Sequence, residues 1–281
     1  MHIPEGFLTG QVTGVGTAVA VAGLAFCVRK ADVTGEDGRL PLAGLAGAFF
    51  LVGDSPFVPI GVGTQGHLLG GTLAVALLGP WLGALTISVV TIVQALVQGD
   101  GGITTLGLNI VNGALVPAFV GWPILRAIQR AVASVRGRGS PGGLALACGA
   151  AAFVNVVLAS VLFVAEYALG HKTPIDLGAL AGTTIGTYAV VAVIEAVITA
   201  GVVAALLARR PDLVLIAPPE LRRPQRRPRP TPRAAASVPP PAGSEPERAR
   251  PAAPPPPPGC EPQRSTADVP ALTSRPEEGS A

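Results

Sequence analysis

Hydrophobic residues form seven runs along the first 208 residues of the chain. The runs cover approximately residues 7–28, 41–53, 66–79, 81–98, 105–125, 143–168 and 177–208. Several are shorter than the ~20 apolar residues that a straight transmembrane helix needs. The second and third runs are short and rich in glycine, which is typical of broken or partly inserted helices around a polar pocket. The pattern predicts an all-α integral membrane protein with about seven transmembrane helices.

The pattern changes at about residue 209. From there to the end lie 20 of the 29 prolines and twelve of the 20 lysines and arginines. Such a composition cannot bury enough apolar surface to offset the entropy of ordering the chain. We therefore expect a membrane domain over residues 1–208 and a disordered Pro/Arg-rich tail over residues 209–281. The arginines that begin the tail favour a solvated segment near anionic lipid headgroups over a docking peptide or a nucleic-acid arm.

Basic residues predict the orientation in the membrane. Arg29, Lys30 and Arg39 share one loop, residues 126–138 carry a second basic group, and a third follows the last apolar run. By the positive-inside rule all three lie in the cytoplasm. Seven crossings then place the N-terminus outside and the tail inside a bacterial cell. The opening MHIPEG lacks the basic segment of a cleavable signal peptide, so the first helix is expected to act as its own signal.

Only 13% of the residues are charged, so the few histidines of the membrane domain are notable. Because the large side chain of His2 disfavours removal of the initiator methionine, Met1 is expected to remain at the N-terminus with its free amine. That amine, the His2 backbone nitrogen and the His2 imidazole can close two chelate rings on one metal ion. Three nitrogens nearly in a plane suit Ni(II) or Cu(II), and Co(II) can be held similarly. His67, in the glycine-rich GVGTQGHLLGG, is the candidate for a fourth nitrogen, whereas His171 is interpreted as an exposed loop residue.

Polar side chains near these histidines are candidates for orienting them. A metal-bound histidine usually donates its other ring proton to a carbonyl, amide or carboxylate. The candidates are Thr64, Gln65, Asn109 and Asn112. Hydrogen bonding between helices is an equally good interpretation of the same residues.

The carboxylates of the domain indicate a metal site less specifically than the histidines do. Glu5, Asp54 and Asp100 could attract a divalent cation to the outer face, and they could equally be ordinary loop charges or helix caps. Glu195 lies deep in the last apolar run. We interpret it as buried against a partner subunit or hydrogen-bonded within the bundle, and not as a metal ligand.

Three motifs, found in the expected order, resemble a known family. They are MHIPEGFL at the N-terminus, GTQGHLLGGTLAVALLGPW, and VQALVQGDGGITTLGLNIVNGALVPAFVG. They resemble the cobalt and nickel permeases CbiM and NikM, which are the substrate-binding S components of energy-coupling factor (ECF) transporters. The resemblance covers about residues 1–205, and the tail has no counterpart in it.

The resemblance implies a function and a set of partners. It implies uptake of Co²⁺ or Ni²⁺ as transported substrate, with no organic cofactor, and metal ligands at Met1, His2 and His67. It also implies a CbiQ-like transmembrane coupling subunit, CbiO-like ATPase subunits and a small CbiN-like membrane subunit, all embedded in or attached to the lipid bilayer. The chain contains no GxxxxGK[ST] phosphate loop, so ATP hydrolysis is expected from separate subunits and this chain is not expected to be an enzyme. The choice between cobalt and nickel stays open.

Two other classes of function remain as alternatives. A stand-alone secondary carrier would need acidic relays within the membrane and usually internal repeats. Only Glu166 and Glu195 qualify as such relays. A membrane metalloenzyme is less favoured, since it would need an open coordination position and a general base, and no HExxH motif is present.

Overall fold

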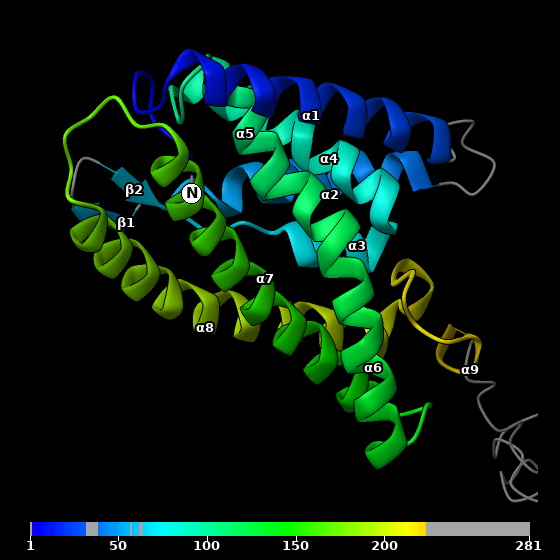
Figure 1. Ribbon diagram of the computed structural model, residues 1–281. Coiled ribbons are helices and arrows are strands. Elements are labelled where there is room, and N and C mark those ends of the chain that lie inside the picture. Colours follow the sequence, from blue (N-terminus) through cyan, green and yellow to red (C-terminus); the bar gives the residue numbers. More distant parts are fainter. Residues whose placement is uncertain (1, 32–38, 57, 62–63, 223–281) are drawn as a thin grey trace, which may run out of the picture. The chain divides into compact units, whose positions relative to one another are not determined.

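The apolar runs fold into helices that run alternately in opposite directions between two ends of the domain (Figure 1). The structure, a computed structural model, describes residues 2–31, 39–56, 58–61 and 64–222, so most of the predicted disordered tail lies outside the described residues. The elements in chain order are α1 (Gly10–Lys30), α2 (Arg39–Gly53), β1 (Val58–Gly61), β2 (Thr64–Gly66), α3 (Gly71–Leu78), α4 (Pro80–Val93), the π-helix η1 (Gln94–Gln98), α5 (Leu106–Ile110), the π-helices η2 (Val111–Leu115) and η3 (Pro117–Gly121), α6 (Trp122–Arg136), α7 (Pro141–Leu169), α8 (Leu177–Arg209), the 3₁₀-helix η4 (Pro211–Leu213) and α9 (Pro219–Arg222).

Within the described residues, five helices are long and apolar enough to cross a membrane. They are α1, Pro80–Gln98, Leu106–Arg136, α7 and α8. Only 22% of the apolar stretch of α1 and 33% of that of α8 is buried inside the chain. Apolar side chains that cover an outer surface so extensively need a non-aqueous surrounding. The helices therefore form a membrane bundle, as the sequence predicted.

The second and third apolar runs form short or interrupted helices, as their length and glycine content predicted. The helix α2 has 15 residues, which span only about 22 Å. In the third run only Gly71–Leu78 is helical, and His67 lies in an irregular segment before it. Ahead of this segment β1 pairs antiparallel with β2, a hairpin that the prediction of an all-α chain missed.

The folded part continues past residue 208, where the domain boundary was expected. In the segment that follows α8, the backbone N–H groups of Leu215 and Ile216 donate to the carbonyls of Leu77 and Ala76, at 3.3 and 3.1 Å. These carbonyls belong to the last turn of α3, where a helix cannot satisfy them itself. Residues 211–222 therefore close the end of the domain at which α3 terminates.

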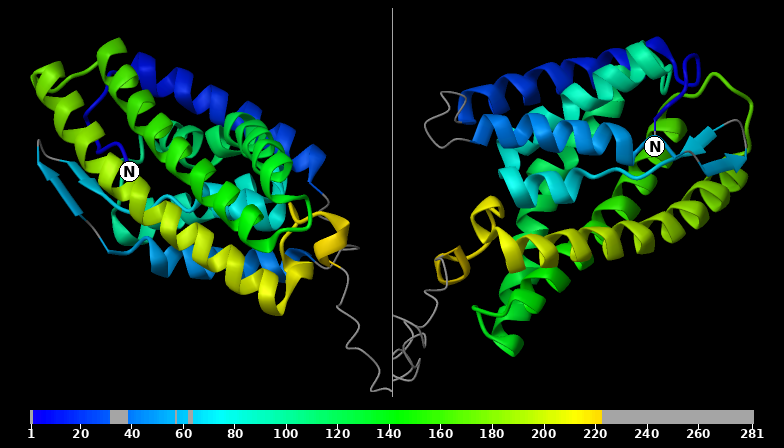
Figure 2. Two further views of the ribbon diagram at one scale, coloured as in Figure 1. Left: turned by 90° about the horizontal axis from the view of Figure 1, so that it is seen from below. Right: turned by 180° about the vertical axis from the view of Figure 1, so that it is seen from behind.

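The N-terminus lies at the opposite end, together with the β1–β2 hairpin and the loops that precede α5 and α8 (Figures 1 and 2). There the first described residues run inside the protein. Ile3 is only 1% exposed. Its N–H donates to Asn109 Oδ1 at 2.7 Å, while its carbonyl accepts from the Gly102 N–H at 2.9 Å and from Thr105 Oγ1 at 2.6 Å. The loop before α5 thus satisfies both backbone groups of a buried residue.

A second loop holds the other side of the same segment. The Lys172 N–H donates to the Phe7 carbonyl at 3.0 Å. The Phe7 ring packs against the rings of Phe163 and Tyr167 on α7, with centroids 6.1 and 5.3 Å away. The N-terminal segment, residues 2–8, is therefore fixed between the loops that precede α5 and α8.

Replacing Gly102 with alanine is expected to weaken this docking. A Cβ at Gly102 would lie 2.6 Å from Glu5 Cα and 2.7 Å from Glu5 N, which are backbone atoms with little freedom to move. Forcing extra volume into a packed site costs about 1–3 kcal/mol. We expect Gly102→Ala to lower the thermal unfolding temperature and to speed proteolysis within residues 2–9. The control is Gly14→Ala, whose added Cβ meets no atom within 4 Å. If both variants had the same unfolding temperature and the same rate of proteolysis, the N-terminal segment would not be docked as described.

Candidate metal centre

Three polar side chains from distant parts of the sequence meet at the end of the domain that holds the N-terminus. His2 precedes α1, His67 follows β2, and Asp100 lies between η1 and α5. His2 Nδ1 lies 2.8 Å from Asp100 Oδ2 and 3.1 Å from His67 Nε2, and His67 Nε2 lies 3.6 Å from Asp100 Oδ2. The three residues are 7%, 3% and 3% exposed. Two nitrogens and a carboxylate oxygen therefore converge on one site that is nearly closed to water.

The spacing of these atoms suits a metal ion. Metal–nitrogen bonds to histidine are about 2.0–2.1 Å long, so two nitrogens at right angles on one ion lie about 2.9 Å apart. The imidazole nitrogens here are 3.1 Å apart, and one ligand atom from each of the three residues falls within 4.8 Å of the others. Across the part of the chain that the structure describes, no second group of three metal-ligating side chains occurs.

A hydrogen bond behind His67 selects the nitrogen that faces this site. His67 Nδ1 lies against the Leu68 carbonyl. A carbonyl only accepts, so the network assigns the ring proton to Nδ1 and directs the Nε2 lone pair toward His2. Burial lowers the pKa of His2. The neutral imidazole is the form that binds metal ions.

Of the predicted orienting residues, Asn109 bonds through its side chain to the backbone of Ile3, the residue after His2. Asn112 Nδ2 instead donates to Glu166 on α7, at 2.9 Å. Thr64 and Gln65 lie in β2, and their side chains are outside the described part of the structure, as is Met1.

Glu195 on α8 holds the segment that carries His67. Its carboxylate oxygens accept from the backbone N–H groups of Leu69 and Gly70, at 2.8 and 3.1 Å, and the residue is 2% exposed. Gly70 has φ 65°, and a Cβ there would lie 2.6 Å from the Phe50 ring. Only glycine suits this turn, because it has no Cβ and tolerates positive φ. Of the two interpretations of Glu195 from sequence, the described contacts are those of hydrogen bonding within the bundle.

The remaining polar candidates have other surroundings. Glu5 accepts from the N–H and the hydroxyl of Thr104, at 3.0 and 2.5 Å, and so ties the N-terminal segment to the loop before α5. Burial and the nearby Glu195 carboxylate raise the pKa of Asp54 to about 8. His171 is exposed and stacks on Tyr167, with ring centroids 4.6 Å apart.

Asp100 was not predicted as a partner of the histidines. Its position in the sequence indicates a charge at the outer face, an ordinary loop charge or a helix cap. The available signal was its place in the glycine-rich stretch QGDGG, after which residues 101–165 contain no other carboxylate. An aspartate so isolated in a membrane domain is a candidate for a site.

Removing the Glu195 carboxylate is expected to weaken metal binding without removing any ligand atom. Glu195→Ala leaves two buried N–H groups unsatisfied and frees the backbone after His67. The loss of residues that support metal ligands typically lowers affinity about 10–100-fold, and we expect a decrease of that size in a titration of the purified protein with Ni²⁺. The matched control is Glu166→Ala, which removes a buried glutamate that is bonded to Asn112. If Glu166→Ala lowered the Ni²⁺ affinity more than Glu195→Ala did, Glu195 would not be the residue that supports the site.

The chain matches known proteins over this whole domain. The family model "Cobalt uptake substrate-specific transmembrane region" matches residues 2–213. The putative fused nickel transport protein NikMN of Archaeoglobus fulgidus is 35% identical over 216 residues, which are 76% of this chain and 68% of that protein. The cobalt transport protein CbiM of Geobacter sulfurreducens is 30% identical over 231 residues, which are 76% of this chain and 61% of that protein.

A solved transporter structure is also similar to this chain. The crystal structure of a truncated transition metal transporter has a TM-score of 0.59 and 31% sequence identity, and the match covers 74% of this chain and 99% of that one. Together with the family model, which matches more than half of the chain, these likenesses confirm the resemblance inferred from the three motifs. This multi-pass membrane protein therefore belongs to the CbiM family of cobalt and nickel transport S components.

Proposed function

We propose that this chain is the substrate-specificity subunit of an ECF-type ABC transporter that imports Co²⁺ or Ni²⁺. The observation that carries the proposal is the buried meeting of His2, His67 and Asp100. Neutral imidazoles are good ligands for both ions, and a buried site excludes the water that would compete for them. The family is one of transport proteins and not of enzymes.

In the proposed site four nitrogens hold the ion. They are the Met1 amine, the His2 backbone nitrogen, the His2 imidazole and His67. The fixed backbone of Ile3 supports this set, because it positions the His2 peptide at the site. The Asp100 carboxylate offsets part of the positive charge of a dication. The same ligand atoms serve cobalt and nickel, so the proposal includes both ions as substrate.

The proposed topology has seven crossings. Besides the five long helices, α2 forms one crossing, and the irregular segment with His67 continues through α3 to form another. The N-terminus and the candidate metal centre then face the outside of a bacterial cell, and the segment after α8 lies in the cytoplasm. A CbiQ-like coupling subunit, CbiO-like ATPase subunits and a small CbiN-like subunit complete the transporter.

The described contacts argue against the stand-alone carrier. Such a carrier would use the two deeply placed glutamates as relays, yet Glu195 is bonded to two backbone N–H groups and Glu166 to Asn112. Both glutamates therefore have structural partners in the described bundle. This favours energy supplied by separate ATPase subunits.

Substituting either histidine is expected to abolish tight metal binding. His2→Ala and His67→Ala each remove a proposed ligand, and the affinity should fall by more than about a hundredfold, beyond the effect of losing a supporting residue. Isothermal titration of the purified protein with Ni²⁺ and with Co²⁺ measures this loss. The matched control is His171→Ala, because His171 lies exposed at the same end of the domain. A variant at position 2 or 67 that kept wild-type affinity would remove its residue from the site.

Lengthening the N-terminus tests the amine separately from every side chain. One alanine placed before Met1 moves the amine out of chelating register and leaves all side chains in the sequence. We expect tight binding to be lost, whereas one alanine added after Ala281 should change nothing. If the lengthened protein bound both ions as tightly as the original, the amine would not be a ligand and the site would consist of side chains alone.

A further inference from the structure

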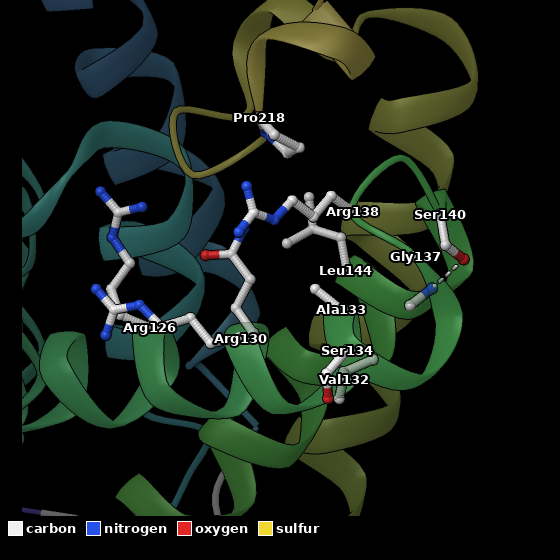
Figure 3. Close-up of a pocket in the computed structure, with 12 residues that line it drawn as sticks. Arg126, Arg130, Val132, Ala133, Ser134, Gly137, Arg138, Ser140, Leu144 and Pro218 are labelled. Atoms are coloured by element: carbon white, nitrogen blue, oxygen red, sulfur yellow. Dashed lines mark hydrogen bonds between the residues drawn. The ribbon is translucent and has the colours of Figure 1, made fainter.

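A cavity with a very different lining lies at the other end of the domain. It has a volume of about 320 Å³ and is lined by α6 from Arg126 onward, the loop after α6, the beginning of α7 and Pro218. Arg126 and Arg130 line it from neighbouring turns of α6, and Arg138 lines it from the loop (Figure 3). Three guanidinium groups therefore border one space.

Among the described residues, none of these three arginines forms an ion pair with a carboxylate. Residues 101–165 contain four arginines and no aspartate or glutamate. Among the described residues, the one ion pair between an arginine and a carboxylate joins Arg210 to Asp212, outside this cavity. Arg126 and Arg130 are also spaced i, i+4 on one helix, where like charges repel each other. An anion in the cavity would relieve this repulsion.

Two further features make the same region attractive to an anion. The cavity includes the beginning of α7, where Ser140 caps the helix by accepting from the Gly143 N–H at 3.1 Å. The N-terminal end of a long helix carries a partial positive charge. Burial and the positive charges of Arg39 and Arg126 lower the pKa of Arg222, so the positive potential extends beyond the cavity itself.

The apolar surroundings distinguish a lipid from a small soluble anion. Val132 and Leu144 line the cavity beside the arginines. The Arg126 guanidinium lies over the Trp122 ring, 4.8 Å from its centroid, and on the same helix Val135 is 85% exposed. Tryptophan and arginine together are typical of the boundary between hydrocarbon and headgroups. An occupant that carries both an anionic head and acyl chains fits this boundary.

We propose that the arginine cavity binds the phosphate headgroup of an anionic phospholipid such as phosphatidylglycerol. Arg126, Arg130 and Arg138 hold the phosphate, and the acyl chains extend along the apolar surface of α6. This site is separate from the candidate metal centre and does not depend on the proposed transport function. Basic cavities between helices on the cytoplasmic side are known sites for anionic headgroups.

The test uses the full chain in detergent with Trp81→Phe, so that Trp122 is the single tryptophan and reports on Arg126. Trp122 fluorescence is titrated with dihexanoyl-phosphatidylglycerol and, in parallel, with dihexanoyl-phosphatidylcholine. We expect saturable binding of the anionic lipid only. Removing three charges in R126Q/R130Q/R138Q should lower its affinity roughly a hundredfold, and R130Q alone roughly fivefold, since each basic residue contributes about 1 kcal/mol.

The control R29Q/K30Q/R136Q removes the same number of charges from residues that do not line the cavity. It should change the affinity by less than about threefold. Equal losses in both triple variants would overturn the proposal in favour of diffuse attraction to a basic surface. Inorganic phosphate or glycerol 3-phosphate binding as tightly as the lipid would also overturn it, because the cavity would then be a site for a soluble phosphate. Thermal unfolding of each variant, with R130Q as the mildest change, separates lost binding from lost folding.

Discussion

The buried backbone of the N-terminal segment is the constraint on which the rest of the structure depends. A peptide group that is removed from water must find hydrogen-bond partners inside the protein, or folding loses several kcal/mol. Ile3 finds them in the loop before α5, through Gly102, Thr105 and Asn109. Its neighbour His2 is thereby brought against Asp100, which belongs to that same loop. The backbone bonds of one residue thus determine the position of the proposed chelate.

The other half of the candidate metal centre is held by the same kind of interaction. His67 lies in irregular backbone, which a membrane protein tolerates only where the protein itself surrounds that backbone. Glu195 supplies the missing partners by accepting from Leu69 and Gly70. Both histidines are therefore carried by non-helical segments, and each segment is fixed by a polar side chain from a long helical stretch. Because the helices hold the non-helical segments in place, these segments can form a small, precise site inside the bundle.

Much of this arrangement could be predicted from the sequence, for physical reasons. Long apolar runs specify helices locally, so α1, α4, α7 and α8 fall close to their expected places. The pairing of His2 with His67 followed from ligand chemistry and from the resemblance to the CbiM family, and the structure places the two rings 4.6 Å apart.

The features that could not be predicted involve contacts between residues that are far apart in the sequence. The partners of Glu195 lie 125 and 126 residues away, and those of the segment after α8 lie in α3. A local pattern of hydrophobic and polar residues cannot reveal such long-range pairs. The β1–β2 hairpin was missed because its residues, with their glycines and proline, lie between two apolar runs and were expected to form a loop. The packing of residues 211–222 was concealed by the proline and arginine that surround their few apolar side chains.

The bonds around the N-terminal segment also bear on how the protein is made. The first residues leave the ribosome long before residues 100–109 and 170–172, which later hold them. The opening peptide therefore has no partners until the loops before α5 and α8 have been synthesised. A polypeptide that ends before residue 100 contains His2 and His67 but lacks Asp100, Asn109 and Glu195, which hold them in place. If the proposed function holds, ion capture is a property of the finished molecule.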